Sequence, residues 1–325
     1  MQERAQDRGE IVIQQALQDG SLHKALLDQV KEGFYILDRD RRILFWNGGA
    51  ERISGYMAHE VAGQYCHGDL FVHCDEQESA LCGEGARLTD VTADGRSREC
   101  TVLLRHRLGH RLPVRVHSHA IRDAGGYVTG TLEMFEEAVA GARHGNQALR
   151  ALGCLDPGSD AVKRSFGEMK LRHALEKLRK FDIPFGWLRI GLDGAAELEH
   201  RYGHGMVDAA MRMIGATLNG SLKALDVLTR WDRTEFRVEA SLRSHVVLAE
   251  VAERLRTLVS ASGLEWWGDR MQVSVSVGGV MAGIDDTLET LEARAERVYE
   301  SCQAAGGNRA AVAHIEGREE TGCSQ

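Results

Sequence analysis

The spacing of hydrophobic positions changes along the chain. Apolar residues recur at helical spacing over residues 10–31, with an interruption at Gly20. Short apolar runs separated by charged turns follow over residues 32–136 and predict antiparallel strands. From residue 156 onward, strand-like runs alternate with helix-like segments, which predicts a sheet covered by helices. The pattern therefore predicts two domains of different construction, preceded by a helix that packs on its own domain or forms a dimer.

The first domain opens with a hairpin pattern. Residues 34–37 (FYIL) and 43–47 (ILFWN) flank a charged turn at 38–41. Residues 32–56 resemble the start of a PAS domain, and residues 108–135 resemble its last three strands. This resemblance implies a small antiparallel sheet with flanking helices that encloses a ligand or makes a dimer contact.

The middle of this first domain is rich in cysteine and histidine. Soft thiol and imidazole groups can hold metals, but their spacing here fits no CxxC-type zinc pattern. A related set of PAS domains carries a further Cys-Pro, whose place is taken here by residues 86–88 (ARL). Two interpretations stay open: small core cysteines with the histidines in a loop, or a redox-sensitive or metal site that could also hold the PAS ligand. The candidates are Cys66, His73, Cys74 and Cys82.

A second histidine pair alternates along one predicted strand. His117 and His119 share a face with Arg115, because side chains two residues apart on a strand point the same way. Such a face could bind an anionic ligand or a metal. It could equally be an ordinary solvent-facing strand surface.

The second domain is organised around residues 228–238, LTRWDRTEFRV. Apolar, β-favouring residues lie on both sides of a short polar centre, which predicts a β-hairpin. The stretch resembles the signature hairpin of GGDEF domains in diguanylate cyclases, which join two GTP molecules into cyclic di-GMP. The five motif positions hold Asp232, Arg233, Thr234, Glu235 and Phe236.

Four further segments carry the same resemblance. They correspond to the family's first strand, its TYGHxxGD segment, its VTVSIG strand and its AGRNR end, at residues 187–193, 201–208, 272–278 and 305–309. Helices are expected over residues 171–181, 206–218 and 244–260. The expected fold class is α+β, with a PAS domain joined by a linker to a GGDEF-like α/β domain whose sheet is mainly antiparallel.

The resemblance places the family's cation-binding acids at two positions where this chain has none. One position holds Gly191 and the other holds Thr234. Mg²⁺ requires oxygen ligands, and carboxylates supply the charge that phosphates need to have neutralised. We therefore expect no catalytic residue and no Mg²⁺ at this site. Glu235 remains, and Phe236 is expected to pack under the hairpin.

The nucleotide contacts of the family are partly retained. Asp208 keeps one guanine-contacting acid, whereas Glu199 replaces an Asn, and Gln303 and Gly307 replace two phosphate contacts. Asp208, Arg230 and Arg233 are therefore candidates for weak nucleotide binding. The family's inhibitory RxxD site corresponds here to Lys223 and Asp226. Lysine lacks the bidentate fork of arginine, so cyclic di-GMP binding there is expected to be weakened.

Three functional hypotheses follow. The first is a regulator in which a PAS sensor controls an inactive GGDEF domain that works through protein–protein contacts, with a homodimer expected and a cyclase, phosphodiesterase or kinase as partner. The second is a receptor that binds GTP or cyclic di-GMP without turnover. The third is a residual cyclase, or one that needs a partner subunit to supply the missing acids. The PAS ligand stays unknown.

Composition limits the expected partners and the expected cellular compartment. The chain has 325 residues, 43% of them hydrophobic, and a net charge of −8, which disfavours nucleic acid as a partner. Seven cysteines argue against a disulfide framework. A polar start and the absence of a long apolar run predict a cytoplasmic protein with no membrane partner. The expected divisions are an N-terminal helix (1–31), the PAS domain (32–136), a linker helix (137–155), the degenerate GGDEF domain (156–315) and a flexible tail (316–325).

Overall fold

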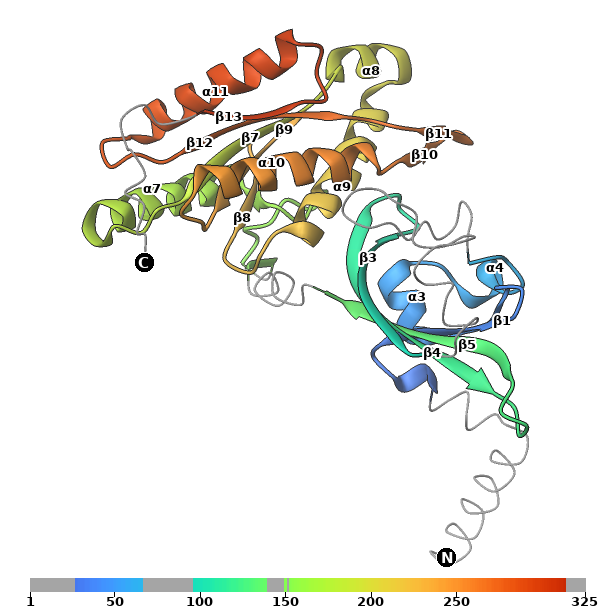
Figure 1. Ribbon diagram of the computed structural model, residues 1–325. Helices are drawn as coiled ribbons and strands as arrows, with labels where there is room; N and C mark the ends of the chain where they lie inside the picture. Colours follow the sequence, from blue (N-terminus) through green and yellow to red (C-terminus); the bar gives the residue numbers. More distant parts are fainter. Residues whose placement is uncertain (1–26, 67–95, 139–148, 151, 314–325) are drawn as a thin grey trace, which may run out of the picture. The chain divides into compact units, whose positions relative to one another are not determined.

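The computed structural model describes residues 27–66, 96–138, 149–150 and 152–313 (Figure 1). Apart from residues 108–111, the chain divides into two compact units at Ala138. Each unit has a hydrophobic core of its own. Within the described ranges, no helix combines the length and the apolar character needed to cross a bilayer.

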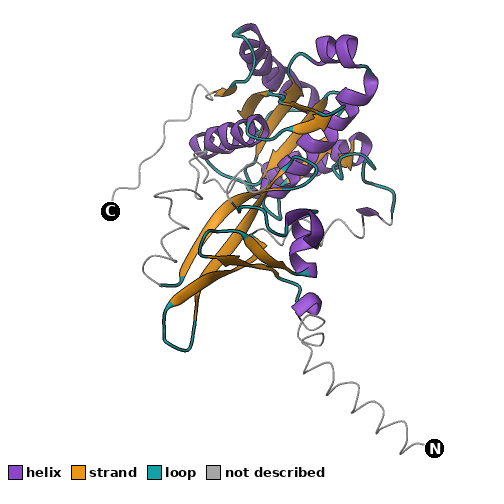
Figure 2. Cartoon of the chain, turned by 90° about the vertical axis from the view of Figure 1, so that its right-hand side faces the viewer, coloured by secondary structure: helices purple, strands orange, loops and turns teal. Residues whose placement is uncertain are grey.

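The first unit is built on a five-stranded sheet in the order β2-β1-β5-β4-β3. The pairings of β1 with β2, β1 with β5, and β4 with β5 are antiparallel. Figure 2 shows the long β4–β5 hairpin and the short helices of this unit. The strands are β1 Gly33–Asp38, β2 Ile43–Trp46, β3 Arg98–Arg105, β4 Arg111–Arg122 and β5 Val128–Glu137, and the helices are α3 Gly48–Ser54 and α4 Ala58–Val61.

One detail of the predicted strand order was wrong. Residues 108–135 contain two strands, β4 and the start of β5, and not three. The third strand, β3, lies earlier in the chain. Its last four residues are all buried, so this stretch lacks the alternation that marks a half-buried strand. The first hairpin, in contrast, is confirmed as β1 and β2.

Asn47 joins helix α3 to the strand before it. Its Oδ1 accepts hydrogen bonds from the backbone N–H of Ala50 (2.8 Å) and of Phe34 (2.9 Å). Its Nδ2 donates to the carbonyl oxygens of Leu27 (3.1 Å) and Glu32 (3.0 Å). The side chain is fully buried, so it caps the helix and satisfies backbone groups that water cannot reach.

Replacing Asn47 with alanine is expected to lower the free energy of unfolding of the first unit by about 2 kcal/mol, because a cap is lost and buried backbone groups lose their partners. Chemical denaturation of the full chain measures the change. Arg39→Ala, at an exposed turn position, serves as control and should stay within about 0.5 kcal/mol of wild type. An Asn47→Ala protein as stable as this control would contradict the assigned role.

The second unit has a six-stranded sheet in the order β13-β12-β7-β9-β8-β6. The three inner pairings are antiparallel and the two outer ones are parallel, so the expected mainly antiparallel sheet is confirmed. The strands are β6 Val162–Lys163, β7 Gly186–Leu192, β8 Val227–Arg230, β9 Glu235–Ala240, β12 Val275–Met281 and β13 Ala310–Ala313, with a separate hairpin of β10 Leu264–Trp266 and β11 Asp269–Met271. The helices are α7 Arg164–Phe181, α8 Ala195–Tyr202, α9 His204–Ser221, α10 His245–Ser260 and α11 Leu288–Ala304.

The two faces of this sheet differ in chemistry. Leu188 and Ile190 of β7 join an apolar core with helices α9 and α10. Of the alternate residues of β7, Trp187 packs with residues of helices α7 and α11, and Arg189 donates to Glu296 of α11. Alternation along a strand thus divides one apolar face from one face that carries charge. The candidate site lies on the charged face.

Several predicted boundaries shift. Helix α7 begins at Arg164, earlier than the expected residue 171, and β12 begins at Val275 rather than at 272. The expected linker helix overlaps strand β5, which runs to Glu137, and Leu155 forms a β-bridge with Val162. Of the expected N-terminal helix, residues 27–29 are helical, and residues 1–26 lie outside the described residues, as do the centre of the linker and the tail.

Candidate functional site

The predicted hairpin is confirmed as β8 and β9, joined by a turn at residues 231–234. The backbone N–H of Trp231 donates to the carbonyl oxygen of Glu235 (3.0 Å) and closes the turn. Oδ1 of Asp232 accepts a hydrogen bond from the N–H of Thr234 (2.9 Å). Phe236 is fully buried. Asp232 therefore stabilises the turn, and Phe236 anchors the hairpin to the core.

Gly191 lies beside Glu235 in the register of β7 and β9. A Cβ atom on Gly191 would lie 2.2 Å from the hydroxyl oxygen of Tyr299 and 2.7 Å from its Cζ. Burial, together with the carboxylates of Glu235 and Asp193, raises the pKa of Tyr299 to about 12, so its phenol stays neutral at physiological pH. The place that the resemblance reserves for an acid is occupied by a tyrosine from α11.

Glu235 is held between two arginines. Its carboxylate accepts hydrogen bonds from Nη2 of Arg189 (2.8 Å) and from Nη1 of Arg237 (2.9 Å). Arg237 also donates through Nε to both carboxylate oxygens of Glu292 (3.0 and 3.1 Å), and Arg189 donates to Glu296 (2.8 Å). These five side chains form a charge network between the sheet and α11, and we refer to them as the Arg–Glu network.

The Arg–Glu network does not fit a divalent cation. Arg237 is 2% exposed, and its guanidinium and that of Arg189 both bind Glu235, so the carboxylate that could act as an oxygen ligand is already engaged by two positive charges. Although burial opposes it, the carboxylates of Glu235 and Glu296 raise the pKa of Arg189, so this positive charge is permanent. Among the described residues there is also no group of three or more acidic, histidine or cysteine side chains arranged to hold a metal.

Asp193 is a partly buried acceptor of several hydrogen bonds that the sequence reasoning missed. Its Oδ1 accepts from Oγ of Ser276 (2.7 Å) and Nε2 of Gln303 (2.6 Å). Its Oδ2 accepts from Oγ of Ser274 (2.7 Å) and the N–H of Asn308 (2.7 Å). Both oxygens are thus saturated, and Asp193 cannot replace the acid missing at Gly191 without losing these bonds. The available signal was the pair Ser274 and Ser276, two residues apart at the start of β12.

The tip arginine connects three acidic or imidazole side chains. Arg233 forms an ion pair with Glu199, contacts Nδ1 of His204 (2.9 Å), and lies 3.7 Å from Oδ1 of Asp208. The structure therefore brings the predicted nucleotide candidates Arg233 and Asp208 together, along with Glu199 at the family's Asn position. In this arrangement the positive charge of Arg233 lies beside the carboxylates of Glu199 and Asp208.

Arg230, the last residue of β8, contacts the same turn. Its guanidinium donates to the carbonyl oxygen of Arg233 and lies 4.9 Å from the centre of the Phe236 ring. Burial lowers its pKa from the ordinary arginine value. Its contacts are with the hairpin itself, so a role in nucleotide binding stays a prediction.

The residues at the inhibitory-site position form a turn. Oδ2 of Asp226 accepts from the N–H of Lys223 (2.9 Å), and Oδ1 accepts from the N–H of Ser241 (2.9 Å). The Lys223 side chain is exposed. Asp226 therefore has a structural role in these contacts, and binding of a nucleotide at this pair stays a prediction.

Of the candidates in the PAS unit, Cys66 is buried and its sulfur accepts hydrogen bonds from Arg41. A sulfur engaged by a guanidinium is not arranged as a metal ligand. His73, Cys74 and Cys82 lie outside the described residues.

The histidines of β4 lie on a polar strand surface. Nδ1 of His117 is 3.8 Å from Glu99, and Nδ1 of His119 is 2.8 Å from Oγ of Ser97. Arg115 on the same face pairs with Glu99 (3.7 Å) and Glu136 (3.4 Å). These contacts favour the solvent-facing interpretation over a ligand site.

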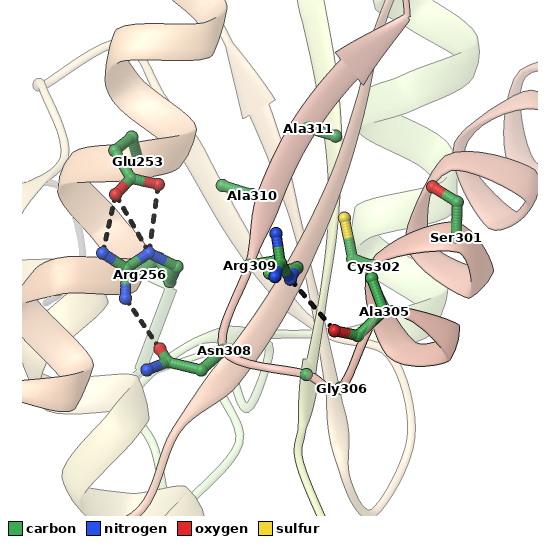
Figure 3. A pocket seen from close by; sticks show the side chains of 11 residues that line it. Glu253, Arg256, Ser301, Cys302, Ala305, Gly306, Asn308, Arg309, Ala310 and Ala311 are labelled. Atoms are coloured by element: carbon green, nitrogen blue, oxygen red, sulfur yellow. Dashed lines mark hydrogen bonds and ion pairs between the residues drawn. The ribbon is translucent and has the colours of Figure 1, made fainter.

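An open cleft of about 670 Å³ lies near Asp193, between α10, α11 and the start of β13 (Figure 3). Arg256 donates to Glu253 and to Oδ1 of Asn308 (2.7 Å). Arg309 donates to the carbonyl oxygen of Ala305 (3.1 Å). Figure 3 shows Arg256 bonded to Glu253 and Asn308, and Arg309 bonded to the backbone of Ala305, so both arginines at the cleft already have partners within the chain.

Comparison with known proteins identifies both units. The family model described as "Diguanylate cyclase, GGDEF domain" matches residues 155–309, and the model described as "PAS fold" matches residues 22–136. A curated relative, Response regulator PleD of Caulobacter vibrioides, is 29% identical over 128 residues, which are 38% of this chain. The match spans only 28% of that relative's length.

Two solved structures are similar to about half of this chain. Diguanylate cyclase SiaD from Pseudomonas aeruginosa, in complex with its activator SiaC, is similar with a TM-score of 0.49 and 22% identity, over 53% of this chain and 66% of that chain. The GGDEF domain of FimX from the same organism is similar with a TM-score of 0.46 and 18% identity, over 48% of this chain and 98% of that one. By its two family-model matches, the chain combines a PAS fold with a GGDEF domain.

Proposed function

We propose that this chain is a signalling regulator whose PAS domain controls a GGDEF domain that no longer makes cyclic di-GMP. The observation that carries the proposal is the occupied cation position. The phenol of Tyr299 fills the space beside Gly191, and two guanidinium groups hold Glu235. Joining two nucleotides requires a divalent cation to neutralise phosphate charge, and this arrangement opposes one.

The tip of the hairpin supports the same proposal. The ion pairs of Arg233 with Glu199 and Asp208 use the side chains that would otherwise meet a guanine base. An incoming nucleotide would have to break these pairs first. A GGDEF domain without turnover retains its folded surface, and we propose that this surface acts through contact with a cyclase, phosphodiesterase or kinase, with the chain itself as a homodimer.

The test is direct. Purified full-length protein is incubated with GTP and Mg²⁺, the products are separated by chromatography, and an active GGDEF protein serves as positive control. No cyclic di-GMP is expected. Cyclic di-GMP made by the wild-type chain would contradict the proposal. In a second experiment, the control GGDEF protein carries an inactivating active-site substitution and is mixed with this chain. Product that forms in the mixture, but with neither protein alone, would favour a cyclase completed by a partner.

Restoring the two acids alone is expected to fail. In Gly191→Asp/Thr234→Glu, the new aspartate meets the Tyr299 hydroxyl and both arginines remain, so product should stay at background. Activity in this double variant would show that the Arg–Glu network does not exclude a cation.

Calorimetry of the wild-type chain with GTP and with cyclic di-GMP tests the receptor hypothesis. Tight binding of either nucleotide without formation of product would indicate a receptor.

A further inference from the structure

Helix α7 presents a strongly basic surface to solvent. On its inner side, Leu171, Leu175 and Leu178 are buried in the core cluster that they share with the sheet. The stretch from residue 163 to residue 180 carries seven lysines and arginines but two glutamates, in a chain whose net charge is −8. All seven basic residues are exposed. They are Lys163, Arg164, Lys170, Arg172, Lys177, Arg179 and Lys180, and we refer to them as the α7 basic surface.

The two glutamates neutralise only part of this charge. Glu168 lies 2.8 Å from Arg164 and 3.9 Å from Arg172, and Glu176 lies 3.8 Å from Lys180. The three basic partners are 57, 68 and 67% exposed, so these ion pairs are weak and can be exchanged for contacts with another anion. The α7 basic surface therefore keeps a positive excess on a protein that is acidic overall.

A cluster of exposed apolar side chains adjoins the end of this helix. Arg179 donates through Nε to the carbonyl oxygen of Ile284 (3.2 Å), and the N–H of Ala282 donates to the carbonyl oxygen of Phe185 (3.0 Å). These bonds tie the segment after α7 to the loop after β12. The large apolar side chains of this region are Phe181, Ile183 and Ile284, which are 69, 48 and 52% exposed, and we refer to them as the exposed apolar cluster. Apolar side chains that are exposed together indicate an interaction surface.

The combination of charge and apolar surface limits the kind of partner. Lysine is depleted in protein–protein interfaces, whereas four of the seven basic residues here are lysines. Nucleic acid would use the charge but not the apolar side chains, and the chain as a whole is acidic. A membrane with anionic lipids uses both features. Its headgroups attract lysine and arginine, and apolar side chains enter the boundary between headgroups and acyl chains.

We propose that the α7 basic surface and the exposed apolar cluster bind a membrane surface that contains anionic lipids, and so hold the GGDEF domain there. This inference goes beyond the regulatory function given above and does not depend on it. The sequence predicted no membrane partner because the chain lacks a long apolar run, but binding at the headgroups requires no such run. Two exposed acids next to the apolar cluster, Asp182 and Asp285, oppose the binding and limit its strength.

The experiment mixes the full chain with vesicles of phosphatidylcholine alone, or of phosphatidylcholine with the anionic lipid phosphatidylglycerol. Centrifugation separates bound from free protein, and the partition coefficient is measured at low and at high salt. Partition into the anionic vesicles is expected to exceed partition into the neutral ones at least about 10-fold. It should fall as salt rises, because ions screen the attraction between exposed charges.

Charge reversal locates the binding surface. Arg172→Glu/Lys180→Glu should lower the partition coefficient at least about 20-fold, since each basic residue near the membrane contributes about a factor of five. The matched control is Arg212→Glu/Arg243→Glu, at exposed positions in α9 and just before α10. It makes the same change in net charge and should bind within about threefold of wild type. Circular dichroism verifies that each variant is folded.

Two further variants test the apolar cluster and its neighbouring acids. Phe181→Ser/Ile284→Ser keeps every charge and should weaken binding about 10-fold, because less apolar surface leaves water. Asp182→Asn/Asp285→Asn should strengthen binding, since it removes two negative charges beside the anionic surface. A gain of binding cannot result from a variant that fails to fold.

No partition of wild type into anionic vesicles, equal partition into neutral ones, or the same loss in the Arg212/Arg243 control would each overturn the proposal. Wild-type protein that ignores the vesicles but binds polyglutamate would also overturn it and would assign the α7 basic surface to an acidic protein. Production of cyclic di-GMP has no bearing on these results, so failure of the proposed function and failure of this inference are distinguishable.

Discussion

Replacing Arg237 with alanine is expected to lower the free energy of unfolding of the GGDEF domain by about 3–5 kcal/mol. The guanidinium is 2% exposed, bonds to Glu235 and Glu292, and lies 5.0 Å from the centre of the Trp231 ring. Its loss leaves two carboxylates with little access to water and removes the packing beneath Trp231. The loss of stability comes mainly from leaving these two carboxylates unpaired and poorly solvated, and not from the strength of the ion pairs themselves.

Denaturant unfolding measures this effect. Arg172→Ala is the matched control, because Arg172 is 68% exposed and lies 3.9 Å from its partner Glu168, so its loss should cost no more than about 0.5 kcal/mol. The double variant Arg237→Ala/Glu292→Gln should recover part of the stability, since it removes one of the stranded carboxylates. An Arg237→Ala protein as stable as Arg172→Ala would show that the network does not stabilise the fold.

The stability of the GGDEF domain is expected to fall as pH rises from about 5 to about 8, with a contribution of roughly 2–3 kcal/mol from Glu239. Burial raises the pKa of this carboxyl from 4.5 to about 7, although Lys170 and Lys177 oppose the shift. Between these two values the folded chain binds a proton that the unfolded chain has released. The stabilisation is therefore complete below the unfolded pKa and is lost as pH rises through the folded one.

Glu239→Gln tests the assignment. The glutamine variant cannot ionise, so its unfolding free energy should change less between the two pH values and should exceed that of wild type at the higher one. Glu176→Gln, at a 60% exposed position of α7, is the control and should follow the wild-type profile. Parallel profiles for Glu239→Gln and wild type would assign the pH dependence to another group.

The elements that sequence predicted well are those whose pattern is local. The β8–β9 hairpin follows from two apolar runs around a polar turn, and β1–β2 follows from the same logic. Strand β3 was missed because Val102 to Arg105 are buried on both faces, so this stretch has no alternation. Local pattern can predict an element only when the burial of that element changes regularly along the chain.

The candidate site was predictable only in part. The absence of acids at Gly191 and Thr234 is visible in the sequence. The contact of Tyr299 with Gly191 depends on how α11 packs against β7, and no local pattern contains it. Arg189 and Arg237 resemble ordinary surface charges, although their alternation with Leu188 and Val238 indicated a distinct face. Asp193 was likewise passed over, because its partners come from three separate segments.

The two faces of the GGDEF sheet also differ in how freely they can change over evolution. On the α9–α10 side, Leu188 and Ile190 pack among other apolar residues, where swaps of similar volume cost little. On the other side, a substitution of Arg237 removes the positive charge that pairs with the carboxylates of Glu235 and Glu292. The first face can therefore drift one position at a time, whereas the second has to change in compensating pairs.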